Sequence, residues 1–171
     1  MKKILVLNSG SSSLKYQLFG VDGDKYEVIA KGLADRIGID NSFVTIKIRD
    51  GEKVTKNVDI PSHQEAIREV FALLLNGALS SMGELAGVGH RVVQGGSIFK
   101  STLVDDKVIE QIDELSTLAP LHNPAAVLGL KAVKALLPDI KQVVVFDTAF
   151  HQTMEPEAYL YPLPLEQYKK H

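Results

Sequence analysis

Residues 4–19 read ILVLNSGSSSLKYQLF, and the expected fold follows from this stretch. Ile4 to Leu7 form a continuous apolar run, which is typical of a strand covered on both faces. Residues 8–12 are small and polar, which favours a turn. From Leu14 onward apolar and polar residues alternate, which is the period of a strand. The stretch therefore predicts two strands joined as a hairpin by a loop rich in glycine and serine.

The rest of the chain is predicted to contain further strands and three helices. Further strands are expected over residues 26–33, 44–49, 54–60, 88–93 and 142–146, and helices are expected to begin after Ser62, Asp105 and His122. Asp50-Gly51 supplies the turn of a second hairpin, whose polar face places it at a sheet edge. Ser62 and Glu65 have the spacing of a capping box. Strands followed by strand–helix alternation predict an α/β domain with a mixed sheet, antiparallel at first and parallel later.

Length and composition exclude several classes of protein. A chain of 171 residues with 45% hydrophobic and 23% charged residues is typical of one globular domain. The net charge is -2, so the chain does not have the excess of basic residues that is typical of a nucleic-acid binder. It contains no cysteine, which excludes disulfides and thiolate sites. No apolar stretch approaches a signal core or the ~20 residues of a membrane span. We therefore expect a cytoplasmic protein with neither nucleic acid nor membrane as a partner.

Two segments in the first hundred residues carry candidate site residues. In NSGSSSLK (8–15), small residues let backbone N–H groups converge on an anion while Lys15 adds a charge, although a plain polar turn remains an alternative. The spacing excludes a Walker A loop. In GHRVVQGG (89–96), Arg91 lies within an apolar strand and suits a carboxylate or phosphate, unless it pairs with an internal acid. His90 is interpreted as a satisfied core or strand-edge histidine.

Two later segments carry further candidate site residues. In APLHNP (119–124), His122 precedes a helix N-terminus that favours anions, although the simpler interpretation is a surface His122 beside an Asn123 N-cap. Asp147 directly follows the last strand, where ligands gather in α/β sheets, or else it caps a turn. No spacing of the five histidines indicates a zinc site.

Taken in order, four segments resemble the signature blocks of the acetate kinase (acetokinase) family. They are NSGSSSLK (8–15), GHRVVQGG (89–96), LAPLHNP (118–124) and FDTAFHQTM (146–154). The resemblance implies a ribonuclease-H-like, actin-like ATPase lobe. It also implies reversible transfer of the ATP γ-phosphoryl group to acetate, which yields acetyl phosphate and ADP with Mg²⁺. Gln94 departs from the pattern, since many relatives carry histidine there.

The resemblance also implies roles for individual residues. Asn8 matches the position linked to the metal, and Ser11, Ser13 and Lys15 match the phosphate-side loop. Arg91 matches the substrate-binding arginine, Val93 and Leu121 match the pocket for the acetate methyl, His122 matches a histidine near the transferring phosphoryl group, and Asp147 matches the essential aspartate.

Chemistry modifies the role of Asp147. Acetate is already ionised at neutral pH, so the nucleophile has no proton for a base to remove. Phosphoryl transfer depends mostly on positioning and charge neutralisation. Arg91 is therefore expected to hold acetate and stabilise the transition state, while Asp147 orients metal, water or Arg91.

The length indicates how much of the active site the chain carries. Family chains continue into a second lobe with an adenosine site, and full-length members are homodimers. Residues 1–171 are therefore interpreted as an N-terminal lobe that is inactive alone. The apolar stretch YLYPLPL (159–165) is of a kind that normally packs against something. The alternative is a short paralogue that binds phosphate, nucleotide or a partner without catalysis. Propionate could replace acetate, since one methylene is worth only ~1–3 kcal/mol of discrimination.

Overall fold

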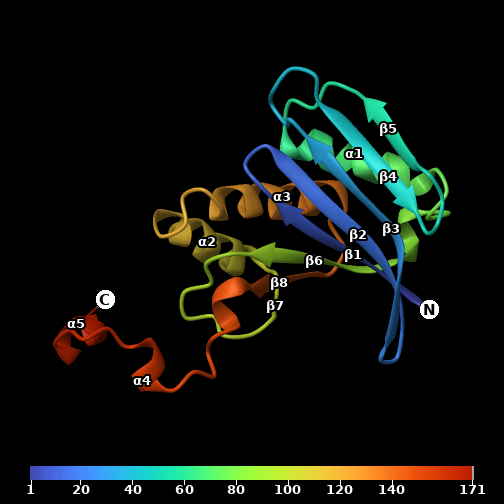
Figure 1. Ribbon diagram of the computed structural model, residues 1–171. Helices are drawn as coiled ribbons and strands as arrows, with labels where there is room; N and C mark the ends of the chain where they lie inside the picture. Colours follow the sequence, from blue (N-terminus) through green and yellow to red (C-terminus); the bar gives the residue numbers. More distant parts are fainter. Residues whose placement is uncertain (171) are drawn as a thin grey trace.

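The chain folds around one mixed sheet of eight strands, which a computed structural model describes for residues 1–170 (Figure 1). The strands lie in the order β5-β4-β3-β2-β1-β6-β8-β7. Their bounds are β1 Lys2–Ser9, β2 Ser13–Asp22, β3 Lys25–Asp35, β4 Phe43–Ile48, β5 Lys53–Asn57, β6 Leu85–Val92, β7 Thr102–Leu103 and β8 Gln142–Phe146. The helices are α1 His63–Leu75, α2 Asp106–Glu114, α3 Asn123–Leu136, α4 Pro156–Tyr159 and α5 Leu165–Lys170.

The pairing of the strands confirms the predicted mixed sheet. β1 to β5 form an antiparallel meander, with β5 at the expected edge. β6 then pairs with β1 in parallel, and β8 pairs with β6 in parallel. The sequence interpretation missed β7, which has two residues and pairs antiparallel with β8. A strand this short has no periodicity that could reveal it.

The helices begin where the capping residues predicted. The Ser62 side chain accepts a hydrogen bond from the Glu65 backbone N–H at 3.3 Å, and Asp105 does the same for Val108 at 2.8 Å. The predicted capping box is only half formed, however. The Glu65 carboxylate pairs with Arg68, one turn along the helix, and no hydrogen bond returns it to Ser62.

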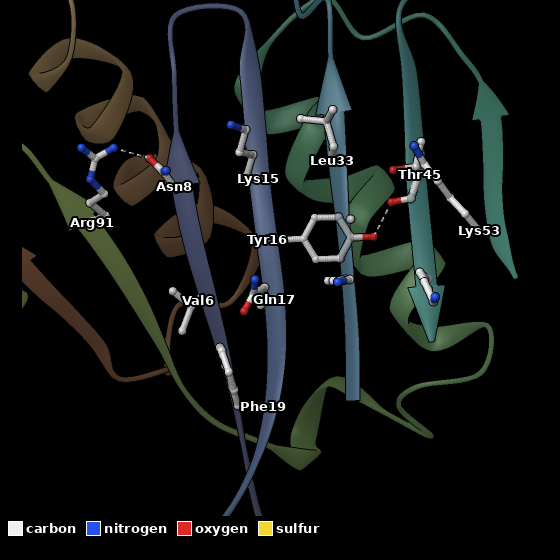
Figure 2. A pocket seen from close by; sticks show the side chains of 13 residues that line it. Val6, Asn8, Lys15, Tyr16, Gln17, Phe19, Leu33, Thr45, Lys53 and Arg91 are labelled. Carbon is white, nitrogen blue, oxygen red and sulfur yellow. Dashed lines mark hydrogen bonds between the residues drawn. The ribbon is translucent and has the colours of Figure 1, made fainter. Parts of the chain in front are cut away.

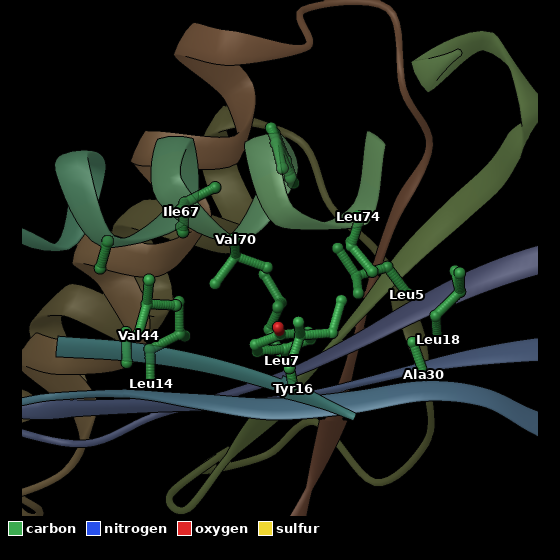
Figure 3. Packing of buried hydrophobic residues seen from close by; sticks show 14 of the residues in the cluster. Leu5, Leu7, Leu14, Tyr16, Leu18, Ala30, Val44, Ile67, Val70 and Leu74 are labelled. Carbon is green, nitrogen blue, oxygen red and sulfur yellow. The ribbon is translucent and has the colours of Figure 1, made fainter. Parts of the chain in front are cut away.

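The core lies between the sheet and one layer of helices. α1 and α3 pack against each other and against β1, β2, β4 and β6, and α2 packs on α3. Figure 3 shows Leu5 and Leu7 of β1 and Leu14 of β2 pointing from the sheet toward α1, which carries Ile67, Val70 and Leu74. Alternation along β1, β2 and β6 sends about every second side chain into this layer, whereas β5 buries none.

One prediction about the apolar strands was wrong. Ile4–Leu7 indicated a strand covered on both faces, yet Val6 is 37% exposed, and Val145 of β8 is 51% exposed. Only one face of the sheet carries helices within residues 1–170, so alternate valines lie on the other, open face. An uninterrupted apolar run thus indicated a strand correctly, but it did not reveal that one face of the strand is open in residues 1–170.

The last described residues form an arm that extends away from the sheet. α4 and α5 lie beyond the β8 end of the molecule in Figure 1. Most aromatic and aliphatic side chains of this arm are exposed, among them Tyr161 at 82%, which lies between the two helices. No helix within residues 1–170 is long and apolar enough to cross a membrane.

Candidate active site

Three predicted site residues meet at the carboxyl ends of neighbouring parallel strands. Asn8 lies near the end of β1, Arg91 near the end of β6, and Asp147 directly follows β8. Parallel pairing brings these ends to one edge of the sheet, which is where α/β folds place ligand sites. Lys15 of β2 joins them, because it lies directly opposite Asn8 in the β1–β2 register.

The guanidinium of Arg91 is held by two neighbours. Its Nε donates to Asp147 Oδ1 at 2.9 Å and to Oδ2 at 3.1 Å, and its Nη2 donates to Oδ2 at 2.5 Å. Nη1 donates to Asn8 Oδ1 at 3.3 Å. The hydrogen bonds to Asp147 raise the pKa of Arg91 above its already high value, so the cation is permanent. Both partners are nearly half exposed, at 49% and 40%, so the pair contributes little stability but orients the guanidinium.

Asn8, Lys15 and Arg91 lie at one side of a broad trough on the open face of the sheet. The trough has a volume of about 640 Å³. Figure 2 shows Arg91 and Asn8 pointing toward each other, with Lys15 on the adjacent strand. Its lining includes five cations, namely Lys15, Lys31, Lys47, Lys53 and Arg91, and no carboxylate. An anion entering the trough would therefore meet the charges of four lysines, and at one side the charge of Arg91, which Asp147 partly offsets.

Three of these lysines form one row across the sheet. Lys31 lies opposite Lys47, and Lys47 lies opposite Lys53. Like charges directly opposite each other destabilise a sheet. None of the three forms an ion pair within residues 1–170. The row thus keeps the trough positive at a cost to the fold.

The serine-rich loop is fastened from two sides. The Gly10 N–H donates to Ser13 O at 2.7 Å, which closes a tight turn between β1 and β2. The buried ring of His63, the first residue of α1, donates through Nε2 to Gly10 O at 2.7 Å. The Ile37 N–H donates to the carbonyl of Ser12 at 2.9 Å. The loop is therefore held by residues from outside the hairpin.

The structure does not bring every predicted residue to one point. Ser11 is exposed and borders a separate hollow between α1 and α3, on the helix side of the sheet. Leu121 is 77% exposed, and His122 is exposed at the N-cap of α3 without a side-chain capping bond. Val93 is half-buried just after β6. None of these four has a side-chain hydrogen bond to Arg91 or Asp147 among the described residues.

Hydrogen bonds join the three later segments through the loop that follows β6. On one side of this loop, the Thr148 N–H donates to Val93 O at 3.3 Å, and Thr148 Oγ1 accepts from the Gly95 N–H at 3.1 Å. On the other side, Asn123 Oδ1 accepts from the Gln94 N–H at 3.1 Å, and Asn123 Nδ2 donates to Gln94 O at 3.0 Å. The loop is thereby held between the turn after β8 and the start of α3.

Two interpretations made from sequence are corrected here. The N-cap of α3 is His122 and not Asn123. The Asn123 side chain is instead fully buried and forms hydrogen bonds to the loop after β6 and to Ile112 O. His90 is a core histidine as expected, at 3% exposed, but it is not satisfied, since its Nε2 has no partner among the described residues. Burial lowers the pKa of His90 to about 4.

Sequence reasoning missed three residues that organise the site, namely His63, Asn123 and Thr148. Each acts through a backbone group far away in sequence, so no local spacing points to it. The proline after Asn123 indicated the helix start correctly, but it gave no information on where the buried amide side chain would bond.

A metal ion would find oxygen ligands here, although an incomplete set. Within residues 1–170 no group of three or more histidine, aspartate or glutamate side chains could hold a metal. The Asn8 amide oxygen and the Asp147 carboxylate both lie beside Arg91. Mg²⁺ prefers oxygen ligands and commonly keeps several waters and substrate phosphate oxygens. This donor set therefore fits Mg²⁺ as one part of a coordination shell.

Comparison with known proteins identifies relatives over the whole chain. The family model described as the acetokinase family matches residues 3–171. The chain is 55% identical over 173 residues to the acetate kinase of Halothermothrix orenii, covering 99% of the chain and 43% of that protein. The chain thus spans less than half the length of the curated relatives it matches.

Solved structures agree with this assignment. The acetate kinase of Porphyromonas gingivalis superposes with a TM-score of 0.90 at 41% identity, covering 100% of this chain and 43% of that one. A propionate kinase from Francisella tularensis gives a TM-score of 0.88 at 36% identity, with the same coverage. The predicted fold class, an α/β lobe with a mixed sheet, is confirmed.

Proposed function

The chain belongs to the acetokinase family, and from this membership we propose that residues 1–171 form one lobe of an acetate kinase. The reaction is the reversible transfer of the γ-phosphoryl group of ATP to acetate, giving acetyl phosphate and ADP. A second lobe would complete the site in a homodimeric protein, since this chain matches only about 43% of its relatives' length.

The orientation of Arg91 is the observation that carries this proposal. Asp147 occupies the edge of the guanidinium formed by Nε and Nη2. The edge formed by Nη1 and Nη2 remains for a ligand, with only the longer contact from Nη1 to Asn8 to displace. A planar carboxylate can accept two parallel hydrogen bonds from such an edge. Arg91 therefore presents a site for the carboxylate of acetate.

The acid–base properties of acetate determine what Asp147 does. The acceptor is ionised at neutral pH and carries no proton for a base to remove. The barrier instead comes from bringing a carboxylate to a negatively charged phosphoryl group, and a fixed cation lowers it. Asp147 contacts Arg91 through both of its oxygens, which supports a role in positioning that cation.

The phosphate groups of the nucleotide would be bound by the hairpin formed by β1 and β2. Lys15 lies beside Asn8 at the edge of the trough, and the turn containing Ser11 and Ser13 adds hydroxyls and backbone N–H groups. Asn8 would contribute an amide oxygen to Mg²⁺. When bound, the metal supplies positive charge to the phosphate oxygens.

The acid accepted by the site is bounded by a small apolar wall. Val93 and Leu121 would contact the methyl group of acetate, and His122 would lie near the transferring phosphoryl group. One structural neighbour is a propionate kinase, and one methylene in a pocket is worth only ~1–3 kcal/mol. We therefore propose acetate as the main acceptor and propionate as a weaker one.

Substitution of Arg91 in the intact two-lobed protein tests this function. We expect Arg91→Ala to lower kcat about 100- to 1000-fold, as loss of a transition-state donor does elsewhere. Asp147→Asn should lower it about 10-fold or more, because the amide no longer pairs with the cation. Arg49→Ala is the matched control, since Arg49 forms an exposed pair with Glu27 away from the trough.

Acetyl phosphate formation is the measurement for these variants. Near-normal turnover in Arg91→Ala or Asp147→Asn would contradict the assigned roles. The isolated 171 residues should form little or no acetyl phosphate, because half a cleft cannot exclude water. Calorimetry with ATP and with acetate on this chain would show whether it binds either one alone, as the non-catalytic alternative requires.

A further inference from the structure

The buried side chain of Asn123 has an unusual set of partners. It is 0% exposed at the first turn of α3, a position where a polar residue normally faces solvent. It accepts from the Gln94 N–H at 3.1 Å and donates to Gln94 O at 3.0 Å, as a neighbouring β-strand would. Its remaining N–H donates to Ile112 O at 3.2 Å. Every hydrogen of this amide is thus used on backbone carbonyls.

No other side chain of similar size supplies this pattern. Aspartate has the same shape but would turn a carboxylate oxygen toward the two carbonyls of Gln94 and Ile112, and alanine would leave all three backbone groups unpaired. An unpaired buried backbone group costs about 1–3 kcal/mol. The position therefore requires an amide.

Gln94 and Asn123, the two residues joined by these hydrogen bonds, are close in sequence to Val93 and Leu121 of the proposed acid-binding wall. Gln94 directly follows Val93, and Asn123 comes two residues after Leu121. The double hydrogen bond between Gln94 and Asn123 therefore ties the backbone next to Val93 to the start of α3, two residues after Leu121. On the opposite side, Thr148 holds the carbonyl of Val93 and the N–H of Gly95.

The loop itself has little freedom to compensate if the hydrogen bonds to Asn123 are lost. Gly96 has a φ of +56°, in the left-handed region that favours glycine. A Cβ at Gly95 would lie 2.6 Å from the ring of Phe146. The backbone of this loop thus depends on close packing as well as on its two hydrogen-bonded sides.

We propose that Asn123 is a positioning residue that sets the width of the acid-binding wall and hence the chain length of the acid accepted. This inference rests on the proposed function, since it assigns Val93 and Leu121 to the alkyl group of the acid. Asn123 does not touch the substrate; it acts through the loop after β6. Thr148 holds the same loop from the other side, so it also helps to position Val93.

Steady-state kinetics of Asn123→Asp in the intact two-lobed protein, with acetate and propionate as acceptors, tests this role. We expect the KM for acetate to rise about 10-fold or more, because a methyl group in a pocket of the right width is worth roughly 10–200-fold. The preference for acetate over propionate in kcat/KM should change about threefold or more, while the KM for ATP stays within about twofold, since the hairpin that faces the nucleotide is untouched.

Ser42→Ala is the matched control. Ser42 is likewise buried and bridges two backbone groups, donating to Val58 O at 2.8 Å and accepting from the Ile60 N–H at 2.9 Å. It lies beside the β4–β5 hairpin, far from the wall. Its loss should lower stability without changing the preference between the two acids. Thr148→Val is the second variant and decides the matter if Asn123→Asp does not fold.

The possible results distinguish the positioning role of Asn123 from the proposed acetate kinase function. A change in acid preference in Asn123→Asp that is absent in Ser42→Ala supports the positioning role, and Thr148→Val takes its place in this comparison only if Asn123→Asp does not fold. Unchanged preference in the folded variants, with loss of stability alone, overturns it and leaves the proposed function standing. Absence of phosphoryl transfer to either acid in the unsubstituted protein overturns the proposed function, and the positioning role with it.

Discussion

The buried histidine beside the candidate site makes a testable prediction about pH. The His90 ring on β6 lies against Gly129 of α3, and its polar neighbour is Gln142 of β8, which raises the pKa of His90 by less than burial lowers it. Neither His90 Nε2 nor Gln142 Oε1 has a hydrogen-bond partner among the described residues. Burial lowers the pKa of His90 from 6.5 to about 4, so the folded protein binds this proton less readily than the unfolded chain. The substitution that isolates the effect is His90→Gln, which keeps a polar side chain and removes the titration.

The sign and size follow from linkage between protonation and folding. Because the folded pKa is depressed, the stability from a neutral His90 is fully present above about pH 6.5 and is lost as the pH falls toward 4. With 1.36 kcal/mol for each pKa unit, the two values give a loss of about 2 kcal/mol between pH 7.5 and pH 5. Lys3 lowers the pKa of Glu84 to about 2, and its contribution is lost only below about pH 4.5.

Urea unfolding at pH 7.5 and pH 5 provides the measurement. The free energy of unfolding of the unsubstituted protein should fall by about 2 kcal/mol more than that of His90→Gln over this interval. Carboxylates titrate in both proteins, so the difference between them reports His90 alone. Parallel pH dependences, or a His90 resonance that titrates near pH 6.5 in the folded protein, would refute the reasoning.

Two further predictions concern packing and the serine-rich loop. Gly32→Ala should destabilise the fold by roughly 3 kcal/mol or more, because a Cβ there would lie 2.0 Å from Thr45 O. Gly89→Ala is the control and should change stability by less than about 1 kcal/mol, because the nearest atom to a Cβ at Gly89 lies 3.8 Å away. Equal melting temperatures of the two variants would contradict this prediction. His63→Ala removes the donor to Gly10 O and should raise the KM for ATP severalfold in the intact protein with little effect on the KM for acetate. Steady-state kinetics checks the second prediction, and an equal rise in both constants would show a general loss of structure instead.

The sequence was sufficient for the seven longer strands, for the helices α1, α2 and α3 and for their order, because those depend on local patterns; it did not indicate β7, α4 or α5. Alternating apolar residues indicated β2 and β4, and Ser62 and Asp105 indicated the starts of α1 and α2. Strand–helix alternation then predicted the parallel pairing of β6 and β8. These signals span at most about two turns of helix or one strand, so one sequence carries them in full.

The sequence could indicate candidate site residues but not their partners. Arg91 stood out as a cation in an apolar strand, and both a ligand and an internal acid were possible partners. The structure shows Asp147 as that acid, 56 residues away, in a geometry that also leaves one edge of the guanidinium for a ligand. No local pattern connects residues so far apart.

By itself, the sequence determined the longer strands, the helices α1, α2 and α3 and a set of polar residues at strand ends, because each follows from the chemistry of a short stretch. Only the tertiary structure decided which of those residues meet. The register of β1, β6 and β8 places Asn8, Arg91 and Asp147 together, and the burial of Asn123 ties α3 to the loop after β6. These contacts join segments distant in sequence, and their geometry depends on how the strands and helices pack.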